Sequence, residues 1–346
     1  MKLGLVVGYS GRKLELPLNI VLEAERLGFD SCWTAEAYGS DAVSPAAWML
    51  AKTTRLKVGT AIMQLPARAP TMAAMTALSL DHLSNGRFIV GLGPSGPQVV
   101  EGWYGASYDK PLTRLREYIE IMRAVFARTA PLEYSGVHYQ LPYKGKDGTG
   151  LGKPLKSILH AEHKIPIYTA SLQPKAVAMS AELCDGFFPV WMNPERYDIF
   201  APAVEKGLAK AGGGKSLADF DVAPFVTVVL GDDVAQCRLP VKAMLALYVG
   251  GMGARGKNFY NDYATQLGYG DAARKIQDLY LDGKKEEAMA QVPDQLVDDI
   301  ALCGPGDRIK ARMQRWLDAG KKKQVGSMLL GTRQPEAMRL LAELVL

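Results

Sequence analysis

Several residue types that often mark a functional site are scarce in this sequence. Its 346 residues include only four cysteines and four histidines. Cys32, Cys184, Cys237 and Cys303 are far apart and show neither a CxxC nor a Cys/His metal-ligand spacing. We therefore expect reduced, mostly buried thiols, a cytoplasmic protein and no bound metal. An HExxH motif is also missing, so zinc-dependent hydrolysis is poorly supported.

Long apolar runs and a strong charge of one sign are missing as well. No stretch is apolar over the ~18 residues that a membrane span needs, so we expect no integral membrane segment. The apolar start, residues 2–9, is too short for a signal peptide and is better interpreted as a first strand. The net charge of +5 is small and dispersed, which argues against nucleic-acid binding and suits a small acidic ligand. Hydrophobic residues make up 48%, enough for a large core.

The clearest local pattern is a β-α-β unit in residues 56–96. Residues 56–63 are a short apolar run typical of a strand, and residues 88–92 are a second one. Between them, residues 71–83 place Met72, Met75, Leu78 and Leu83 roughly on one helical face, so we expect the methionines to fill the core. The second strand runs directly into the turn Gly93-Pro94-Ser95-Gly96.

Similar units follow one another along the whole chain. The predicted strands, each followed by a helix, are residues 2–9, 29–34, 56–63, 88–92, 165–170, 186–191, 221–230 and 324–330. Eight alternating units of this kind predict an α/β fold, a (β/α)8 TIM barrel formed as one domain by residues 1–346. Two stretches interrupt the pattern, residues 131–164 after helix four and residues 250–303 after helix seven. The first contains the hairpin-like LEYSGVHYQLPY, and the second is helical and irregular in pattern.

In such a barrel, ligands bind at the carboxyl ends of the strands. The residues expected there are mostly small, apolar or amide-bearing, with Glu36 as the clearest acidic group. They include no Ser/His/Asp set and no carboxylate cluster. A site so poor in acid–base groups favours a bound organic cofactor that brings its own reactivity.

Three segments carry a resemblance to a known family: KVGTAIMQLPARAP, GRFIVGLGPSG and IPIYTASLQPKAVAMSAELCDGFFPVW. They resemble the luciferase-like superfamily, especially its coenzyme F420 branch with methylenetetrahydromethanopterin reductase and related mycobacterial oxidoreductases. The resemblance implies a homodimeric F420-dependent oxidoreductase that transfers a hydride between the deazaflavin and a small organic substrate. Two alternatives stay open. One is an FMN-dependent luciferase-like monooxygenase, and the other is a flavin- or deazaflavin-binding protein without turnover.

The resemblance also assigns residues near the deazaflavin ring. It implies a carboxylate at the end of strand two, where Glu36 would assist proton movement or ring orientation. Some family members have a histidine next, where this chain has Ala37, which puts a histidine-based mechanism in doubt. A non-proline cis peptide is implied at Ala61-Ile62, behind the ring. Gln64 would bond the edge or side chain of the cofactor.

Further residues are implied around the rest of the cofactor and the substrate. The turn with Gly93, Ser95, Gly96 and Gln98 would lie beside the cofactor. The backbone of Ala170, Ser171, Leu172 and Gln173 would hold its phosphate, near the start of the next helix.

Tyr9 and Trp191 would line the substrate pocket, although Trp191 is equally interpretable as a core residue. A lysine-rich loop, residues 144–156, either meets the acidic cofactor tail or is an ordinary solvated surface.

Overall fold

The computed structural model of the protein describes residues 1–346 and contains a curled parallel sheet. Its strands are β1 (Lys2–Gly8), β2 (Ser31–Thr34), β3 (Lys57–Thr60), β4 (Met63–Gln64), β5 (Phe88–Gly93), β8 (Ile167–Ala170), β9 (Gly186–Phe188), β10 (Asp221–Val222), β11 (Phe225–Leu230), β12 (Leu302–Gly304) and β13 (Ser327–Gly331). Every pairing in this sheet is parallel, as alternating β and α units require. The predicted TIM-barrel fold is confirmed.

The sheet closes through the segment that contains β10 and β11. β10 pairs with β9, whereas β11 pairs with β13, which in turn pairs with β1. Because β10 and β11 are separated by only two residues, this one segment joins the two ends of the sheet. β12 is an additional short strand beside β11 that the sequence pattern did not predict.

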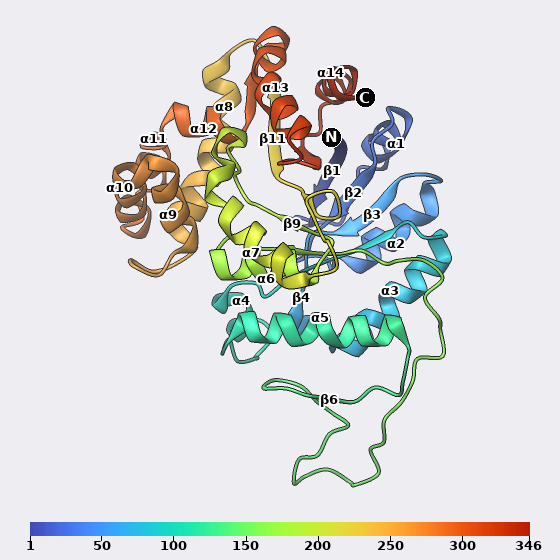
Figure 1. Cartoon of the computed structure of the whole chain (residues 1–346). Helices are drawn as coiled ribbons and strands as arrows, with labels where there is room; N and C mark the ends of the chain where they lie inside the picture. The colour runs from blue at the N-terminus through green and yellow to red at the C-terminus, as the bar shows by residue number, and fades with distance from the viewer.

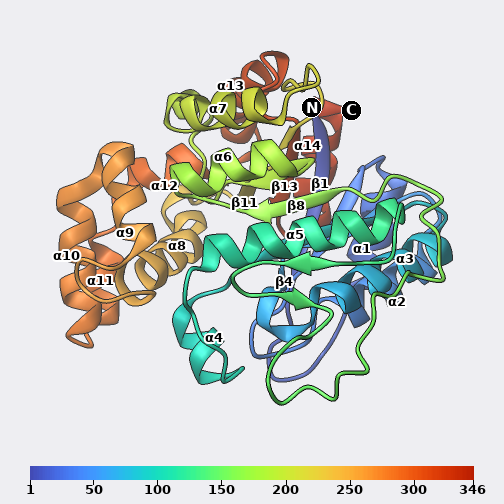
Figure 2. The same cartoon turned by 60° about the horizontal axis from the view of Figure 1, so that its bottom comes forward.

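Helices surround the sheet (Figures 1 and 2). Those that follow the strands are α1 (Leu18–Arg26), α2 (Val43–Lys52), α3 (Pro70–Ser84), α4 (Pro97–Gly102), α5 (Pro111–Ala127), α6 (Pro174–Leu183), α7 (Ala201–Ala211), α8 (Val234–Leu245), α13 (Gly306–Lys321) and α14 (Pro335–Val345). Two 3-10 segments, η1 (Leu65–Ala67) and η2 (Pro194–Ile199), lie before α3 and α7. None of the helices is long and apolar enough to cross a membrane.

The buried apolar residues form two groups. The larger group, 74 residues, contains apolar residues of both the strands and the surrounding helices. The smaller one consists of Trp33, Ile89, Tyr168, Phe188, Ala223 and Leu329, all on barrel strands or directly beside them. Ala61 and Ile62 pack against this smaller group, which we call the inner cluster.

The expectation that Met72 and Met75 fill the core was wrong. Their exposed fractions are 52% and 53%, and Leu83 is 84% exposed, whereas Leu78 is buried. The buried face of α3 is instead rich in small residues, including Ala73, Ala74 and Ala77. Leu78 and Leu80 are the long apolar side chains that α3 buries beside these alanines, whereas its two methionines lie on the outer face.

The two interruptions have different structures. Residues 131–164 form a long arm that projects from the barrel in Figure 1, with the short antiparallel pair β6 (Tyr134–Ser135) and β7 (Gln140–Leu141). The hairpin prediction is therefore confirmed. Residues 246–300 are helical: η3 (Ala246–Gly251), α9 (Phe259–Ala264), η4 (Thr265–Tyr269), α10 (Gly270–Leu281), α11 (Lys285–Ala290) and α12 (Asp294–Ile300). Both η3 and η4 are π-helical.

The four cysteines are buried and unpaired, as their spacing predicted. Burial raises the pKa of the Cys32 and Cys184 thiols to about 12 in each case. A thiol in this state is a poor nucleophile at neutral pH.

Candidate functional site

Glu36, which follows β2, is a buried carboxylate that is fully engaged by the protein. Its exposed fraction is 7%. Its Oε1 accepts hydrogen bonds from the Gln64 backbone N–H at 2.7 Å and from Arg68 Nη1 at 2.7 Å. Its Oε2 accepts from Arg68 Nη2 at 2.9 Å and from the Ala42 backbone N–H at 2.9 Å. This fork-like pairing holds the carboxylate in one orientation.

Arg68 is the partner that the sequence did not reveal. Its side chain is 16% exposed. Burial by itself would lower the pKa of Arg68, but the hydrogen bonds and charge of Glu36 outweigh it and raise the pKa above its usual value. The Arg68 carbonyl also accepts a hydrogen bond from Tyr118 Oη of α5, at 3.2 Å. The ion pair thus joins the β2 end to the segment between β4 and α3.

Gln64 is positioned by this ion pair and carries an unsatisfied polar atom. Its side-chain Nε2 donates to Ser95 Oγ at 3.0 Å, across to the turn after β5. Its Oε1 is buried and has no hydrogen-bond partner. A buried acceptor without a partner is uncommon in folded proteins and costs about 1–3 kcal/mol. It indicates a donor that the protein itself does not supply.

The peptide bond between Ala61 and Ile62 is cis, as expected from the resemblance. Both residues lie against the inner cluster. The Ile62 side chain also contacts the end of β5, because a Cβ atom added at Gly93 would lie only 2.6 Å from Ile62 Cδ1. Because Gly93 has no side chain, the segment that contains Ile62 can pack against the turn after β5.

The turn after β5 is held from two sides. Ser95 has a φ of +65°, a conformation that few residues other than glycine adopt. Tyr108 Oη donates to the Ser95 carbonyl at 3.2 Å, and Gln64 bonds the Ser95 hydroxyl as described. Gly96 precedes α4 as its N-cap, and Gln98 on that helix is exposed.

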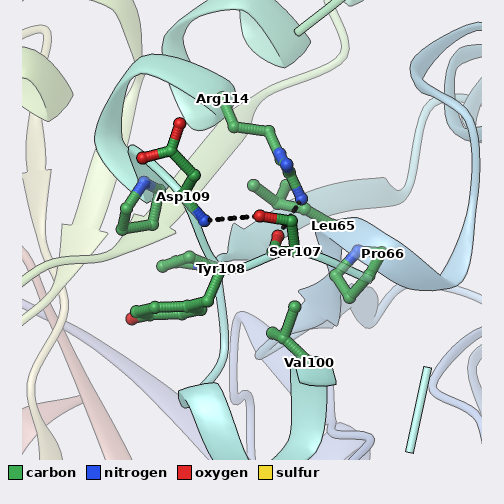
Figure 3. Close-up of a pocket in the computed structure, with 9 residues that line it drawn as sticks. Leu65, Pro66, Val100, Ser107, Tyr108, Asp109 and Arg114 are labelled. Atoms are coloured by element: carbon green, nitrogen blue, oxygen red, sulfur yellow. Dashed lines mark hydrogen bonds between the residues drawn. The ribbon is translucent and has the colours of Figure 1, made fainter. Parts of the chain in front are cut away.

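A small pocket lies beside this turn (Figure 3). It is lined by Leu65, Pro66, Pro94, Val100, Ser107, Tyr108, Asp109, Pro111 and Arg114. Arg114 closes one side by donating to the Ser107 carbonyl at 2.8 Å. The Asp109 backbone N–H bonds the Ser107 hydroxyl at 3.2 Å. These contacts fix the segment that contains Tyr108.

The loop after β8 was expected to hold a phosphate. Ser171 is buried, and its hydroxyl pairs with Ser180 Oγ at 2.8 Å on α6, so it is engaged inside the protein. Ala170 is exposed, and Leu172 and Gln173 are half-buried. Gln173 is the N-cap of α6 and forms no side-chain cap, but its carbonyl accepts from the Ala176 and Val177 N–H groups. Because Pro174 has no N–H, Lys175 is the one residue in the first turn of this helix whose amide is left for another acceptor. Backbone amides, rather than the Ser171 hydroxyl, are the donors available here.

The two proposed pocket residues have different environments. Tyr9 follows β1 and is 51% exposed. Trp191 follows β9 and is only 4% exposed. Its ring packs against those of Tyr248, at 5.7 Å, and Tyr260, at 5.3 Å between centroids. The sequence did not single out these two tyrosines, since they come from the region after strand seven.

The lysine-rich loop, residues 144–156, lies on the projecting arm. Lys144, Lys146, Lys153 and Lys156 are all exposed there. That this loop meets the acidic tail of the cofactor stays a prediction.

Among the site residues that the sequence patterns did not identify, Arg68 could have been found from its position after a strand. It follows strand three, and Glu36 follows strand two. Because the carboxyl ends of neighbouring parallel strands meet at one edge, an acid and a base at these places can pair. No sequence pattern identifies Tyr108, Tyr248 or Tyr260, because the residues that they contact come from distant parts of the chain.

The chain is similar to known proteins over nearly its whole length. The luciferase-like monooxygenase family matches residues 7–322. A Mycobacterium tuberculosis protein, provisionally named coenzyme F420-dependent oxidoreductase Rv3520c, is 45% identical over 100% of this chain and 99% of its own. The 5,10-methylenetetrahydromethanopterin reductase of Methanolobus tindarius is 25% identical over 92% of each chain.

Solved structures show the same fold. The F420-dependent tetrahydromethanopterin reductase of Methanopyrus kandleri has a TM-score of 0.75 at 21% identity, over 99% of this chain and 97% of its own. The oxygenating constituent of a Baeyer–Villiger monooxygenase from Pseudomonas putida, solved in complex with FMN, has a TM-score of 0.66 at 14% identity. The match covers 99% of this chain and 97% of that chain. At these identities the likeness shows the fold alone. From the family match and the full-length similarity, this chain belongs to the luciferase-like monooxygenase family.

Proposed function

We propose that this protein is a coenzyme F420-dependent oxidoreductase that transfers a hydride between the deazaflavin and a small organic substrate. The full-length 45% identity to a relative named for that activity supports the cofactor and the reaction class. The observation in the structure that carries the proposal is the buried, unpartnered Oε1 of Gln64 at the barrel mouth. The pyrimidine edge of a deazaflavin carries an N–H donor that such an acceptor suits.

The residues present fit this group. Gln64 and the Ser95 turn would hold the ring edge, and the backbone amides of the loop after β8 would receive the phosphate. Ala61 and Ile62, which lie against the inner cluster, would form an apolar wall. When bound, the deazaflavin would give a hydride from C5 in its reduced form and take one there in its oxidised form. An apolar site keeps water away from it.

In this proposal Glu36 is a positioning residue. Both of its oxygens accept hydrogen bonds from Arg68 and from backbone N–H groups. Every hydrogen bond that this carboxylate accepts therefore comes from a group of the protein itself. Its bond to the Gln64 N–H fixes the residue that would meet the cofactor.

Binding experiments test the cofactor. The purified protein is titrated separately with F420 and with FMN, and the fluorescence of each compound is followed. We expect F420 to bind more tightly. Tight binding of FMN with no binding of F420 would overturn the proposal in favour of the monooxygenase alternative. Exchange of a labelled hydride between C5 of bound F420 and a substrate would exclude a carrier without turnover.

A substitution at Gln64 sharpens this test. Gln64→Leu removes the buried acceptor and the bond to Ser95 while nearly keeping the volume. We expect F420 affinity to fall by about 10-fold, with the fold retained. The matched control is Gln314→Leu, a change on the exposed face of α13. If both variants bind F420 as the unmodified protein does, Gln64 does not contact the cofactor.

A further inference from the structure

The turn at Ser95, beside the proposed cofactor residues, has a backbone conformation that neighbouring groups must hold. The φ of Ser95 is +65°, and a residue other than glycine keeps such a conformation only where the surrounding contacts enforce it. Two side chains bond this residue. The Gln64 amide donates to its hydroxyl at 3.0 Å, and the Tyr108 hydroxyl donates to its carbonyl at 3.2 Å. The shape of the turn therefore depends on where Tyr108 is held.

The segment that contains Tyr108, residues 107–110, has little backbone support of its own. None of its N–H groups donates to another backbone group. The Ser107 carbonyl instead accepts a hydrogen bond from Arg114 Nη1 of α5, at 2.8 Å (Figure 3). The space left in the pocket between these residues is about 10 Å³, room for one water molecule. The Arg114 side chain thus ties the Ser107 end of this segment to α5.

The same guanidinium also reaches the arm. Arg114 Nη2 donates to Nδ1 of His138, at 3.3 Å. His138 lies in the turn between β6 and β7, residues 136–139, which we call the hairpin turn. One side chain therefore bonds two segments that are otherwise separate, the hairpin turn and the segment that contains Tyr108.

The hairpin turn is itself fixed on α5 by a buried carboxylate. Glu117 accepts hydrogen bonds from the backbone N–H groups of residues 137–139, at 2.6, 2.8 and 3.1 Å. Successive amides of this kind form a concave site for an anionic group. Gly136 lets the carboxylate come close, because a Cβ atom there would lie 2.5 Å from Glu117 Oε2. The acceptor on His138 is thereby held in place relative to Arg114.

We propose that Arg114 is a positioning residue for the cofactor. It holds the segment that contains Tyr108 against the Ser95 turn, and the hairpin turn of the arm is its anchor. This inference rests on the proposed function, because it takes the Ser95 turn to be part of the cofactor site. In this scheme Arg114 contacts neither the cofactor nor the substrate. The arm, although it projects from the barrel, then helps to shape the site at the barrel mouth.

Amide hydrogen exchange, followed by mass spectrometry without any cofactor, tests the positioning role. Arg114→Met removes both hydrogen bonds and keeps an apolar stem. We expect peptides that cover residues 93–96 and 107–110 to exchange at least about 5-fold faster, because the contacts that hold them are lost. Peptides of α14 should exchange as before. Unchanged exchange at residues 93–96 would overturn the proposal.

The matched control lies on the same helix. Arg116 of α5 pairs with Glu182 of α6 at 2.6 Å and bonds neither the hairpin turn nor residues 107–110. Arg116→Met should therefore leave exchange at residues 93–96 unchanged. Faster exchange there in both variants would show that loss of any arginine loosens α5, and would also overturn the proposal.

Titration with F420 tests the consequence for the cofactor. We expect Arg114→Met to weaken F420 by about 5- to 10-fold, and Arg114→Lys, which can still bond one of the two acceptors, to weaken it less. The loss should be the same at about 50 mM and about 500 mM salt, because no charge in contact with the cofactor is removed. A loss that disappears at high salt would mean that Arg114 binds the acidic tail directly, against the proposal.

A double variant tests the path through Tyr108. Tyr108→Phe removes the hydroxyl that bonds the Ser95 carbonyl and should also weaken F420. If Arg114 acts through this residue, the double variant Arg114→Met/Tyr108→Phe should bind no more than about 2-fold more weakly than Arg114→Met alone. Effects that multiply would show two independent roles and contradict this path.

The two proposals fail in distinguishable ways. If F420 does not bind the unmodified protein, the proposed function is wrong, and the exchange experiment still decides whether Arg114 holds the Ser95 turn. If F420 binds but Arg114→Met changes neither exchange nor affinity, the cofactor proposal stands and the positioning role is wrong.

Discussion

At the scale of single residues, the central feature is the buried ion pair between Glu36 and Arg68. Glu36 and Arg68 are both largely buried, and each satisfies the other through two hydrogen bonds. Breaking a buried pair by removing one partner leaves an uncompensated charge and costs about 3–5 kcal/mol. A substitution at Glu36 is therefore expected to change the stability of the fold as well as the binding of the cofactor.

We expect Glu36→Gln to lower the free energy of unfolding by about 3–5 kcal/mol, because Arg68 loses its counter-charge. F420 affinity should fall together with stability, since Gln64 is no longer held. Chemical denaturation and F420 titration measure the two effects. The double variant Glu36→Gln/Arg68→Met, which carries neither charge, should recover part of the stability. Loss of turnover with unchanged stability and unchanged F420 affinity would instead indicate direct proton transfer by Glu36.

At the scale of elements, the approach of β3 to β5 sets the geometry of the site. Thr60 Oγ1 donates to the Gly91 carbonyl and accepts from the Gly91 N–H, both at 2.9 Å. A Cβ atom at Gly91 would lie 1.7 Å from the Thr60 carbonyl oxygen, a backbone atom that cannot turn away. Only glycine fits at this point of the sheet.

Gly91→Ala is accordingly expected to destabilise the protein severely, by at least several kcal/mol, or to prevent folding. Thermal unfolding monitored by circular dichroism measures this. Gly102→Ala is the matched control, because a Cβ there meets nothing within 4 Å. A Gly91→Ala protein as stable as this control would show that the two strands are farther apart than described.

The strand that closes the barrel carries a buried acid. Asp221 Oδ2 on β10 accepts hydrogen bonds from Tyr168 Oη at 3.0 Å and Ser327 Oγ at 2.5 Å, while its buried Oδ1 has no partner. Burial raises the pKa of Asp221 above its usual value. The neutral form of Asp221 is therefore favoured more in the folded state than in the unfolded chain.

Stability should therefore depend on pH through Asp221. A raised folded-state pKa gives a contribution that is fully present below the unfolded pKa and is lost as pH rises through the folded pKa. Asp221→Asn can accept the same two hydrogen bonds and does not ionise. We expect its stability relative to the unmodified protein to increase from pH 4 to pH 7, measured by urea unfolding. Asp262→Asn, at an exposed site, controls for loss of one surface charge. A pH-independent difference for Asp221→Asn would contradict this assignment.

At the scale of the whole molecule, long apolar side chains remain outside on two neighbouring helices. Trp48 of α2 is 53% exposed, and Met72 and Met75 of α3 are 52% and 53% exposed. Exposed apolar groups of this size often mark an interface. Together with the resemblance, they lead us to propose that two copies associate through this face.

We expect the unmodified protein to be a dimer by light scattering after size-exclusion chromatography. Met72→Glu/Met75→Glu places charges in the proposed interface and should give monomers at micromolar concentration. Leu151→Glu on the arm, where Leu151 is 85% exposed, is the control and should remain dimeric. A monomeric unmodified protein would reject the proposal, and monomers only with Leu151→Glu would move the interface to the arm.

By itself, the sequence determined the succession of strands and helices and the hairpin in residues 131–164, and its resemblance to a known family implied the cis peptide at Ala61-Ile62. Periodicity and turn residues act between near neighbours in the chain, and the family pattern is carried by short segments. The helical pattern misplaced Met72 and Met75 because the alanines of α3, not its longest side chains, face the protein.

Only the tertiary structure decided how distant side chains meet. It paired Glu36 with Arg68 and left Gln64 Oε1 buried without a partner. It also brought Trp191 together with Tyr248 and Tyr260. Such contacts join residues dozens of positions apart, and they depend on the closure of the barrel rather than on any local preference of the chain.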